Sequence, residues 1–155
     1  MRKFLLTTAA LLAATSIPAA AQDREVPYWA SLKSEEVNMR VGPSRDFEIE
    51  WVYKRKGMPL KVVRVVDGWR LVRDPDGEEG WVASSLLTLA PQAMVTGEEW
   101  AAMRADPADN GTLKWNAEPG VVGALGKCDA GWCEFDVEGR TGWVKQDRLW
   151  GAGEP

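Results

Sequence analysis

The stretch VDGWRLVRDPDGEEGWV (residues 66–82) contains two Gly-Trp pairs, each next to a short run of apolar and β-branched residues. A similar stretch, DAGWCEFDVEGRTGWV, returns at residues 129–144. The match continues outward, because MRVGP (39–43) corresponds to MRADP (103–107) and Trp51 corresponds to Trp115. An internal duplication of a unit of about 55–60 residues explains these correspondences.

Each unit is predicted to consist of β-strands. In the first unit, IEWVYK (49–54), LKVVRVV (60–66) and WRLVR (69–73) are short segments rich in β-branched and aromatic residues. Asp67-Gly68 between two of them predicts a tight hairpin, because glycine adopts the positive φ that primed turns need. Short strands at this spacing favour a small closed barrel or a sandwich.

One segment of the second unit is ambiguous. TGEEWAAMR (96–104) resembles a helix start, since Thr96 and Glu99 have the spacing of a capping box. The repeat alignment places it opposite Leu32–Arg40, so an extended conformation is predicted. The chain is therefore expected to be all-β, with one barrel over 29–90 and a second over 93–151.

The first 21 residues are predicted to be a signal peptide. Met1-Arg2-Lys3 is cationic, the following residues to Ala14 are apolar, and Ala19-Ala20-Ala21 is a small-residue cleavage site. The protein is expected to be periplasmic or secreted. No membrane span is predicted, because the apolar stretch is shorter than the roughly 20 residues that a spanning helix needs.

Composition excludes several kinds of site. The chain has no histidine, so the usual Ser-His-Asp and Cys-His nucleophilic sites and histidine-ligated metal sites are excluded. Its formal net charge of −4 argues against a nucleic-acid partner, because such binding depends on neutralising phosphates. No metal and no cofactor is predicted, and the sequence leaves the oligomeric state open.

Charge is distributed unevenly between the two units. Residues 37–73 contain nine basic and four acidic side chains, whereas residues 98–155 contain six basic and eleven acidic ones. A solvated surface of mixed sign is the favoured interpretation. Attraction between the two units is the alternative.

The two cysteines are predicted to form a disulfide. If Ala130-Gly131 is a two-residue turn, Cys128 and Cys133 lie opposite each other with Cα atoms about 4.5 Å apart, which a disulfide accepts. An exported chain meets oxidising conditions. A Cys-x4-Cys metal or redox site is the weaker alternative, because it lacks further ligands.

The acidic segment DPDGEE (74–79) is predicted to be a turn. Its clustered acids and glycine resemble part of a calcium loop, but the full spacing of ligands in such a loop is absent. The position between two strands favours a hairpin connection.

Aromatic residues supply the candidate binding surface. The chain has nine tryptophans, and those at 51, 69, 81, 115, 132 and 143 are expected to lie mainly in the cores. One or two in each unit are expected to line an exposed groove instead. The candidate ligand-binding residues are Trp51, Tyr53, Trp69 and Trp81, and Tyr53 is the preferred groove residue because its hydroxyl needs a polar partner.

The opening EVNMRVGPS, the central DGW hairpin and the final GWVASSLL resemble the bacterial SH3-like domain family. Residues 35–89 resemble it closely, and 98–151 resemble a diverged second copy. The resemblance implies two SH3-like β-barrels in tandem and a binding role. Relatives fused to wall hydrolases target those enzymes to peptidoglycan, and others mediate protein contacts.

The favoured function is a non-catalytic periplasmic module that binds peptidoglycan or an envelope protein. A cell-wall glycoside hydrolase that uses carboxylates alone is one alternative, since it needs no histidine. A purely structural or inhibitory envelope protein is another, and the sequence does not separate it from the first.

Overall fold

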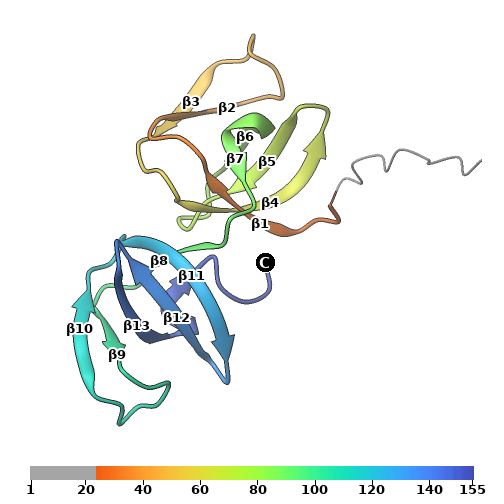
Figure 1. Cartoon of the computed structure of the whole chain (residues 1–155). Helices are drawn as coiled ribbons and strands as arrows, with labels where there is room; N and C mark the ends of the chain where they lie inside the picture. The colour runs from red at the N-terminus through yellow and green to blue at the C-terminus, as the bar shows by residue number, and fades with distance from the viewer. Residues whose placement is uncertain (1–23) are drawn as a thin grey trace, which may run out of the picture.

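The computed structural model describes residues 24–155, which form two antiparallel sheets that follow one another along the chain (Figure 1). The all-β class and the tandem arrangement are confirmed. The predicted signal peptide lies outside the described residues. We call the part that contains the first sheet the first domain and the part that contains the second sheet the second domain; the predicted domain limits, 29–90 and 93–151, remain a prediction.

The first sheet has the strand order β3-β2-β6-β5-β4-β1-β7. Its elements are β1 (Tyr28–Leu32), β2 (Val37–Arg40), β3 (Ile49–Tyr53), β4 (Pro59–Val66), β5 (Trp69–Arg73), β6 (Glu79–Ala83), the short 3₁₀ helix η1 (Ser84–Leu86) and β7 (Leu87–Thr88). The three strand segments predicted in this unit correspond to β3, β4 and β5.

The second sheet repeats this order as β10-β9-β13-β12-β11-β8-β14. Its elements are β8 (Gln92–Val95), β9 (Ala101–Arg104), β10 (Leu113–Ala117), β11 (Val122–Asp129), β12 (Trp132–Val137), β13 (Arg140–Lys145), η2 (Gln146–Arg148) and β14 (Leu149–Trp150). The segment 96–104 contains no helix, but only Ala101–Arg104 form a strand and residues 97–99 are bends, so the predicted extended conformation is correct for the second half of the segment alone.

The duplication is visible in the strand register. Equivalent residues of the two domains make equivalent cross-strand pairs: Met39 with Trp51 and Met103 with Trp115, Arg40 with Trp81 and Arg104 with Trp143. The sequence repeat is therefore a repeat of structure, down to individual pairs.

The two glycines of each Gly-Trp phrase have different roles. Gly68 and Gly131 lie in hairpin turns with φ of 71° and 81°, a region that glycine adopts without strain. Gly80 and Gly142 lie within strands instead. A Cβ atom at either position would collide with the methionine packed against it, Met39 or Met103 respectively. The first glycine thus makes the turn, and the second admits the core methionine.

Each sheet encloses its own apolar core. Buried residues of the first core are Ala30, Leu32, Val37, Met39, Tyr53, Leu60, Val62, Val72 and Val82. Those of the second are Ala93, Val95, Ala101, Met103, Ala117, Cys133, Phe135, Val144 and Leu149. Small β domains bury little area, so these few residues carry most of the hydrophobic stabilisation of each domain.

The predicted core position of the tryptophans is only partly correct. Trp81 and Trp132 are buried, and three others are half-buried: Trp69, Trp115 and Trp143. Trp51 is 59% exposed, so the prediction that places it in the core is wrong. Its ring projects from an edge strand, where no neighbouring strand covers it.

A tryptophan pair ties the two domains together. Trp29 of β1 and Trp150 of β14 meet edge to face with ring centroids 4.9 Å apart, and Lys61 Nζ lies 5.4 Å from both centroids. The Trp29 indole donates to the carbonyl of Gly153 at 2.9 Å, and the Trp150 indole donates to that of Pro59 at 3.0 Å. We call this arrangement the tryptophan latch.

Candidate functional site

A groove in the first domain brings together two of the four predicted ligand-binding residues. It encloses about 690 Å³. Its lining comes from β2, β3 and the loops that follow β3 and β5: Met39, Glu50, Trp51, Val52, Tyr53, Lys54, Arg55, Met58, Asp74, Asp76 and Glu78. We call it the Trp51 groove.

Tyr53 forms part of the wall of this groove but is a core residue. It is only 3% exposed, so its side chain is largely closed off from the groove, and ligand binding by Tyr53 stays a prediction. The polar partner that its hydroxyl needs is the buried carboxylate of Asp74, to which it donates at 3.2 Å. Burial, followed by the negative charge of Asp74, raises the pKa of Tyr53 above its ordinary value, so the hydroxyl stays protonated and donates.

Asp74 organises the acidic loop. Its Oδ1 accepts the backbone N–H groups of Asp76 and Glu78, each at 3.0 Å, while Oδ2 accepts from Tyr53. The backbone N–H of Gly77 donates to the Asp74 carbonyl at 3.1 Å. The predicted turn at 74–79 is confirmed. One of its acids is therefore structural, and the carboxylates of Asp76 and Glu78 remain at the mouth of the groove.

The arrangement of the groove suits a ligand with an apolar or cationic face. Trp51 offers an exposed indole, and Met39 and Met58 add flexible apolar surface to the same lining. An indole face attracts cations and stacks on flat or apolar ligand surfaces. Glu50, Asp76 and Glu78 add negative charge on the same lining, while Lys54 and Arg55 add positive charge.

The second domain keeps equivalents of Met39 and Trp51 but lacks other parts of this groove. Ala117 replaces Tyr53, and β12 and β13 are joined by the two-residue turn Glu138-Gly139 instead of a five-residue loop. Trp115, the equivalent of Trp51, is half-buried. The guanidinium of Arg140 lies 4.5 Å from its ring centroid.

The other two predicted residues do not line this groove. Trp81 is buried and pairs with Arg40 on one side and Leu71 on the other. Trp69 is half-buried and pairs with Ala83 at the far end of β5. Ligand binding by Trp69 or Trp81 stays a prediction.

The predicted disulfide is present in the second domain. Cys128 and Cys133 are bonded, with Cα atoms 4.0 Å apart. The turn residues Ala130 and Gly131 both have positive φ, and Cys128 pairs directly with Cys133 across the hairpin. The bridge therefore closes a hairpin, and it lies in the domain that lacks the groove.

Residues 24–155 contain no grouping of three or more histidine, cysteine, aspartate or glutamate side chains arranged to hold a metal ion. None of the helices in this described part has the length and apolarity required to cross a membrane.

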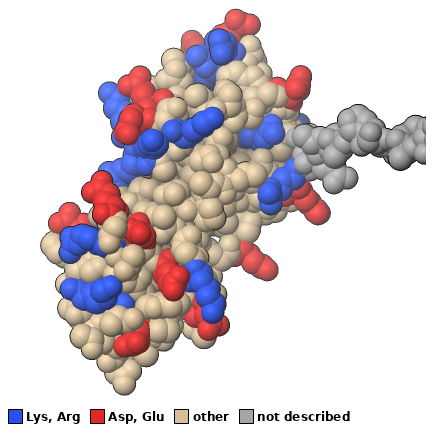
Figure 2. Space-filling view, viewed as in Figure 1, with Lys and Arg blue, Asp and Glu red and all other residues tan. Residues whose placement is uncertain are grey.

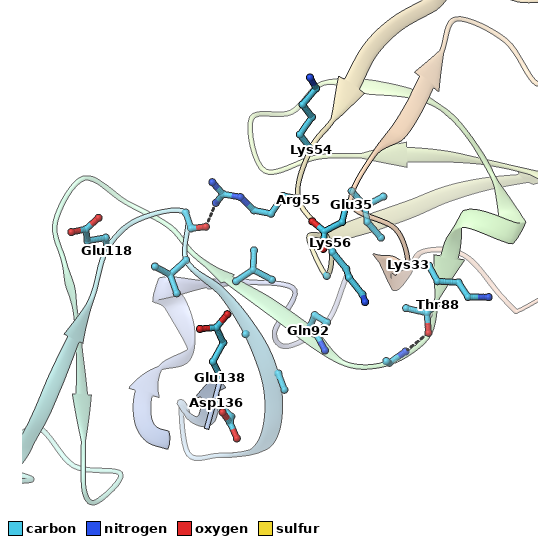
Figure 3. Close-up of a pocket in the computed structure, with 18 of the residues that line it drawn as sticks. Lys33, Glu35, Lys54, Arg55, Lys56, Thr88, Gln92, Glu118, Asp136 and Glu138 are labelled. Atoms are coloured by element: carbon cyan, nitrogen blue, oxygen red, sulfur yellow. Dashed lines mark hydrogen bonds between the residues drawn. The ribbon is translucent and has the colours of Figure 1, made fainter. Parts of the chain in front are cut away.

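A second and larger cavity, of about 990 Å³, lies between the domains, and we call it the interdomain cleft. The first domain contributes Lys33, Glu35, Lys54, Arg55 and Lys56 to its lining, and the second contributes Glu118, Asp136 and Glu138. Arg55 crosses the cleft and donates to the carbonyl of Gly120 (Figure 3). Sequence reasoning missed this site; the only signal for it was the unequal charge of the two units.

The sequence of both domains matches one family model. That model, described as the bacterial SH3 domain, matches residues 33–88 and again residues 97–151. The chain belongs to the bacterial SH3 domain family. In this tandem bacterial SH3 protein each matched segment contains all strands of one sheet except the first, β1 or β8, so the duplication is a duplication of the family's domain.

Individual relatives are more distant. The chain is 27% identical, over 163 aligned residues, to the Bacillus subtilis (strain 168) protein named "Putative N-acetylmuramoyl-L-alanine amidase YrvJ", and the match covers 96% of this chain but 30% of that protein. Among solved structures, NlpC1 from Trichomonas vaginalis aligns over 84% of this chain and 48% of its own with 14% identity and a TM-score of 0.38. NlpC2 from the same organism aligns over 83% and 49% with 12% identity and a TM-score of 0.37. The bacterial SH3 pair thus spans less than a third of its curated relative and about half of each of these structures.

Proposed function

We propose that the protein is a cell-wall binding module that recognises peptidoglycan through the Trp51 groove and catalyses no reaction on it. The observation that carries this proposal is the exposed indole of Trp51 beside the apolar and acidic lining of the groove. Exposed aromatic residues at the centre of a concave site supply much of the binding energy in recognition surfaces. The expected ligand face is a sugar ring or a peptide segment with an amine.

Two further facts support this choice of ligand class. The chain consists largely of two bacterial SH3 domains. The relative from Bacillus subtilis carries a name that refers to N-acetylmuramoyl-L-alanine, a constituent of peptidoglycan. Export by the predicted signal peptide to the periplasm or beyond belongs to the same proposal, because the ligand lies outside the cytoplasm.

Binding is tested by co-sedimentation of the purified protein with purified sacculi. Trp51→Ala is expected to weaken binding about 10-fold, which corresponds to the loss of a central aromatic contact. Trp100→Ala is the matched control, because Trp100 is also 59% exposed but lies in the second domain. Trp51→Ala is expected to leave the free energy of unfolding nearly unchanged, since so much of the side chain is already in water.

Three results would contradict the proposal. Wild-type protein that stays in the supernatant would redirect the search to an envelope protein partner. Equal weakening by Trp51→Ala and Trp100→Ala would remove the groove from recognition. Release of soluble fragments that Asp76→Asn or Glu78→Gln abolishes would indicate a carboxylate glycoside hydrolase, the alternative that the acidic rim of the groove permits.

A further inference from the structure

We propose that the interdomain cleft is a second binding subsite, and that it takes a part of the ligand carrying both a carboxylate and an ammonium group. The proposal rests on the proposed function, because it takes the peptide portion of peptidoglycan as the ligand. It adds a site that involves both domains, whereas the Trp51 groove belongs to the first domain alone.

The two walls of the cleft carry charges of opposite sign. Lys33, Arg55 and Lys56 come from the first domain, with Glu35 as the acidic exception, and the wall of the second domain has only acids as charged groups. At one edge of the junction, Figure 2 shows basic side chains of the first domain approaching acidic side chains of the second. The uneven charge of the two sequence halves therefore becomes an uneven charge across one cavity.

Two of these side chains face the space between the walls. Figure 3 shows Lys56 extending from the first domain toward the second, and the carboxylate of Glu138 extending from the second domain into the same space. Lys54 points away from the second domain in this view. Lys56 and Glu138 are therefore two of the charged groups that a ligand inside the cleft meets.

The two walls do not neutralise each other. Within residues 24–155 the ion pairs are Arg73 with Glu79 and Lys145 with Asp109, and neither pair spans the cleft. Arg55 reaches across, but it donates to a backbone carbonyl rather than to a carboxylate. A ligand that enters the cleft thus finds charge of both signs without a protein partner.

The separation of the walls is held by contacts on either side of the cleft. In the tryptophan latch, one indole hydrogen bond joins β1 to the C-terminal segment, and the other joins β14 to the Pro59 carbonyl of β4. Two equivalent glycines meet the opposite domain, because a Cβ at Gly57 would lie 3.3 Å from Gln92 and one at Gly120 would lie 3.0 Å from Arg55. A cavity held open in this way is organised for a ligand before the ligand arrives, which lowers the entropic cost of binding.

The cleft adjoins the Trp51 groove. Lys54 and Arg55 line both cavities, so an extended ligand seated on Trp51 passes over these two residues into the cleft. Two linked contacts on one ligand strengthen binding by more than either contact alone.

The sign of the walls decides the chemistry of the ligand. An anion without an amine would gain from Lys56 but be repelled by Glu138, and a cation without a carboxylate would meet the reverse. A group with both charges gains from both walls when its carboxylate faces Lys56 and its amine faces Glu138. Peptide segments with a free carboxylate and a free amine have this chemistry.

The test measures the binding of each protein variant to unmodified and to chemically modified peptides. Soluble peptides released from purified sacculi are used untreated, amidated at their carboxylates, or acetylated at their amines, and their dissociation constants are measured by calorimetry. Each modification is expected to weaken binding to the wild-type protein about 2- to 5-fold for each charge pair lost. In Lys56→Gln the penalty for amidation should shrink while that for acetylation persists, and in Glu138→Gln the reverse should hold.

Lys127→Gln is the control for Lys56→Gln, and Glu98→Gln is the control for Glu138→Gln. Each control removes an exposed charge of the same sign as its counterpart, but outside the cleft. Penalties that are identical in wild type, Lys56→Gln and Glu138→Gln would overturn the subsite while leaving the Trp51 groove intact. A change of either penalty in the control variants, without a change in Lys56→Gln and Glu138→Gln, would also overturn it. Failure of the wild-type protein to bind sacculi would instead refute the proposed function itself.

Discussion

The two domains share their strand order and their cross-strand pairs, yet they differ in what surrounds the third strand of each. In the first domain, Tyr53 is buried against Asp74 and Trp51 is exposed. In the second, Ala117 needs no polar partner, and Trp115 lies under Arg140. The comparison shows that the two copies of a duplicated framework can differ in function: one copy carries the Trp51 groove, and the other carries a disulfide and a tryptophan covered by an arginine.

The difference depends on one connection between strands. The loop from Asp74 to Glu78 in the first domain provides the carboxylate that accepts from Tyr53 and places Glu78 on the lining of the Trp51 groove. The two-residue turn of the second domain provides neither, and it places Arg140 over the equivalent ring instead. Loop length, together with the replacement of Tyr53 by Ala117, distinguishes the domain that has the groove.

The largest effect is expected from Tyr53→Ala. The side chain is almost completely buried, so its removal should lower the free energy of unfolding of the first domain by about 3–5 kcal/mol. Hydrogen exchange measured residue by residue should show the loss of protection in β1 to β7 while β8 to β14 keep theirs. Equal loss in both domains would mean that the domains unfold as one unit.

Tyr53→Phe is the matched control for the hydroxyl. It keeps the ring and removes the donor to Asp74, which should cost about 1 kcal/mol at neutral pH. The raised pKa of Tyr53 means that the hydroxyl loses its proton more easily in the unfolded chain. Its contribution is thus complete below pH ~10 and declines as the pH rises above that value, and Tyr53→Phe should lack this decline.

The sequence predicts local features well because their causes are local. Strands β3, β4 and β5 follow from alternating and β-branched residues, and the two-residue turn at Ala130-Gly131 sets the pairing that brings Cys128 to Cys133. Tyr53 is different. Its partner lies 21 residues away, so nothing near it in sequence shows that its hydroxyl is satisfied inside the domain.

A smaller loss is expected from Cys128→Ala. Cys128 is exposed and Cys133 is completely buried, so this change breaks the bridge while the core sulfur stays in place. A closed loop this short should contribute about 2 kcal/mol. Hydrogen exchange should locate the loss in the second domain, and reduction of the wild-type protein should reproduce it.

A loss of hydrogen-exchange protection in the first domain of Cys128→Ala would be unexpected. It would show that the disulfide also supports the contact between the domains, in contrast to the local role that its hairpin position indicates.

Glu78→Arg tests the difference between the two tryptophans directly. Glu78 in the repeat corresponds to Arg140, so an arginine at this position should cover Trp51 as Arg140 covers Trp115. Binding to sacculi should weaken about 5-fold, because an aromatic contact of about 1 kcal/mol is blocked. The free energy of unfolding should change by less than about 0.5 kcal/mol.

Arg140→Glu is the reciprocal variant. It should expose Trp115 without creating a site, because the second domain lacks the loop that completes the groove. Binding gained through Arg140→Glu would show that an open tryptophan is sufficient by itself.

The arrangement of the two domains could not be predicted from the sequence. Trp29 and Trp150 are far apart in the chain, and neither belongs to the repeated Gly-Trp phrase. Their contact depends on the path of the C-terminal segment back to β1, which no local pattern encodes. The unequal charge of the two units is visible in the sequence. The cleft in which these charges face each other depends on that same long-range contact.

The smallest effect concerns an ion pair that only the second domain contains. Lys145 pairs across the strands with Trp132, and its Nζ lies 5.7 Å from the ring centroid and 2.6 Å from Asp109 Oδ1. The equivalent partner of Trp69 is Ala83, which has no charge. The hydrogen bond from Lys145, followed by its positive charge, lowers the pKa of Asp109 below its ordinary value. A depressed folded-state pKa contributes stability above the unfolded value of about 3.9, and that contribution is lost as the pH falls through the lower folded value.

Because Asp109 is exposed to water and salt screens the pair, the change in unfolding free energy should be close to zero. The titration itself is the sensitive measurement: the carboxyl carbon resonance of Asp109, followed by NMR, should have a higher midpoint in Lys145→Gln and in concentrated salt. A midpoint that neither condition moves would show that the pair does not persist in solution, and the two domains would then differ at this position only in sequence.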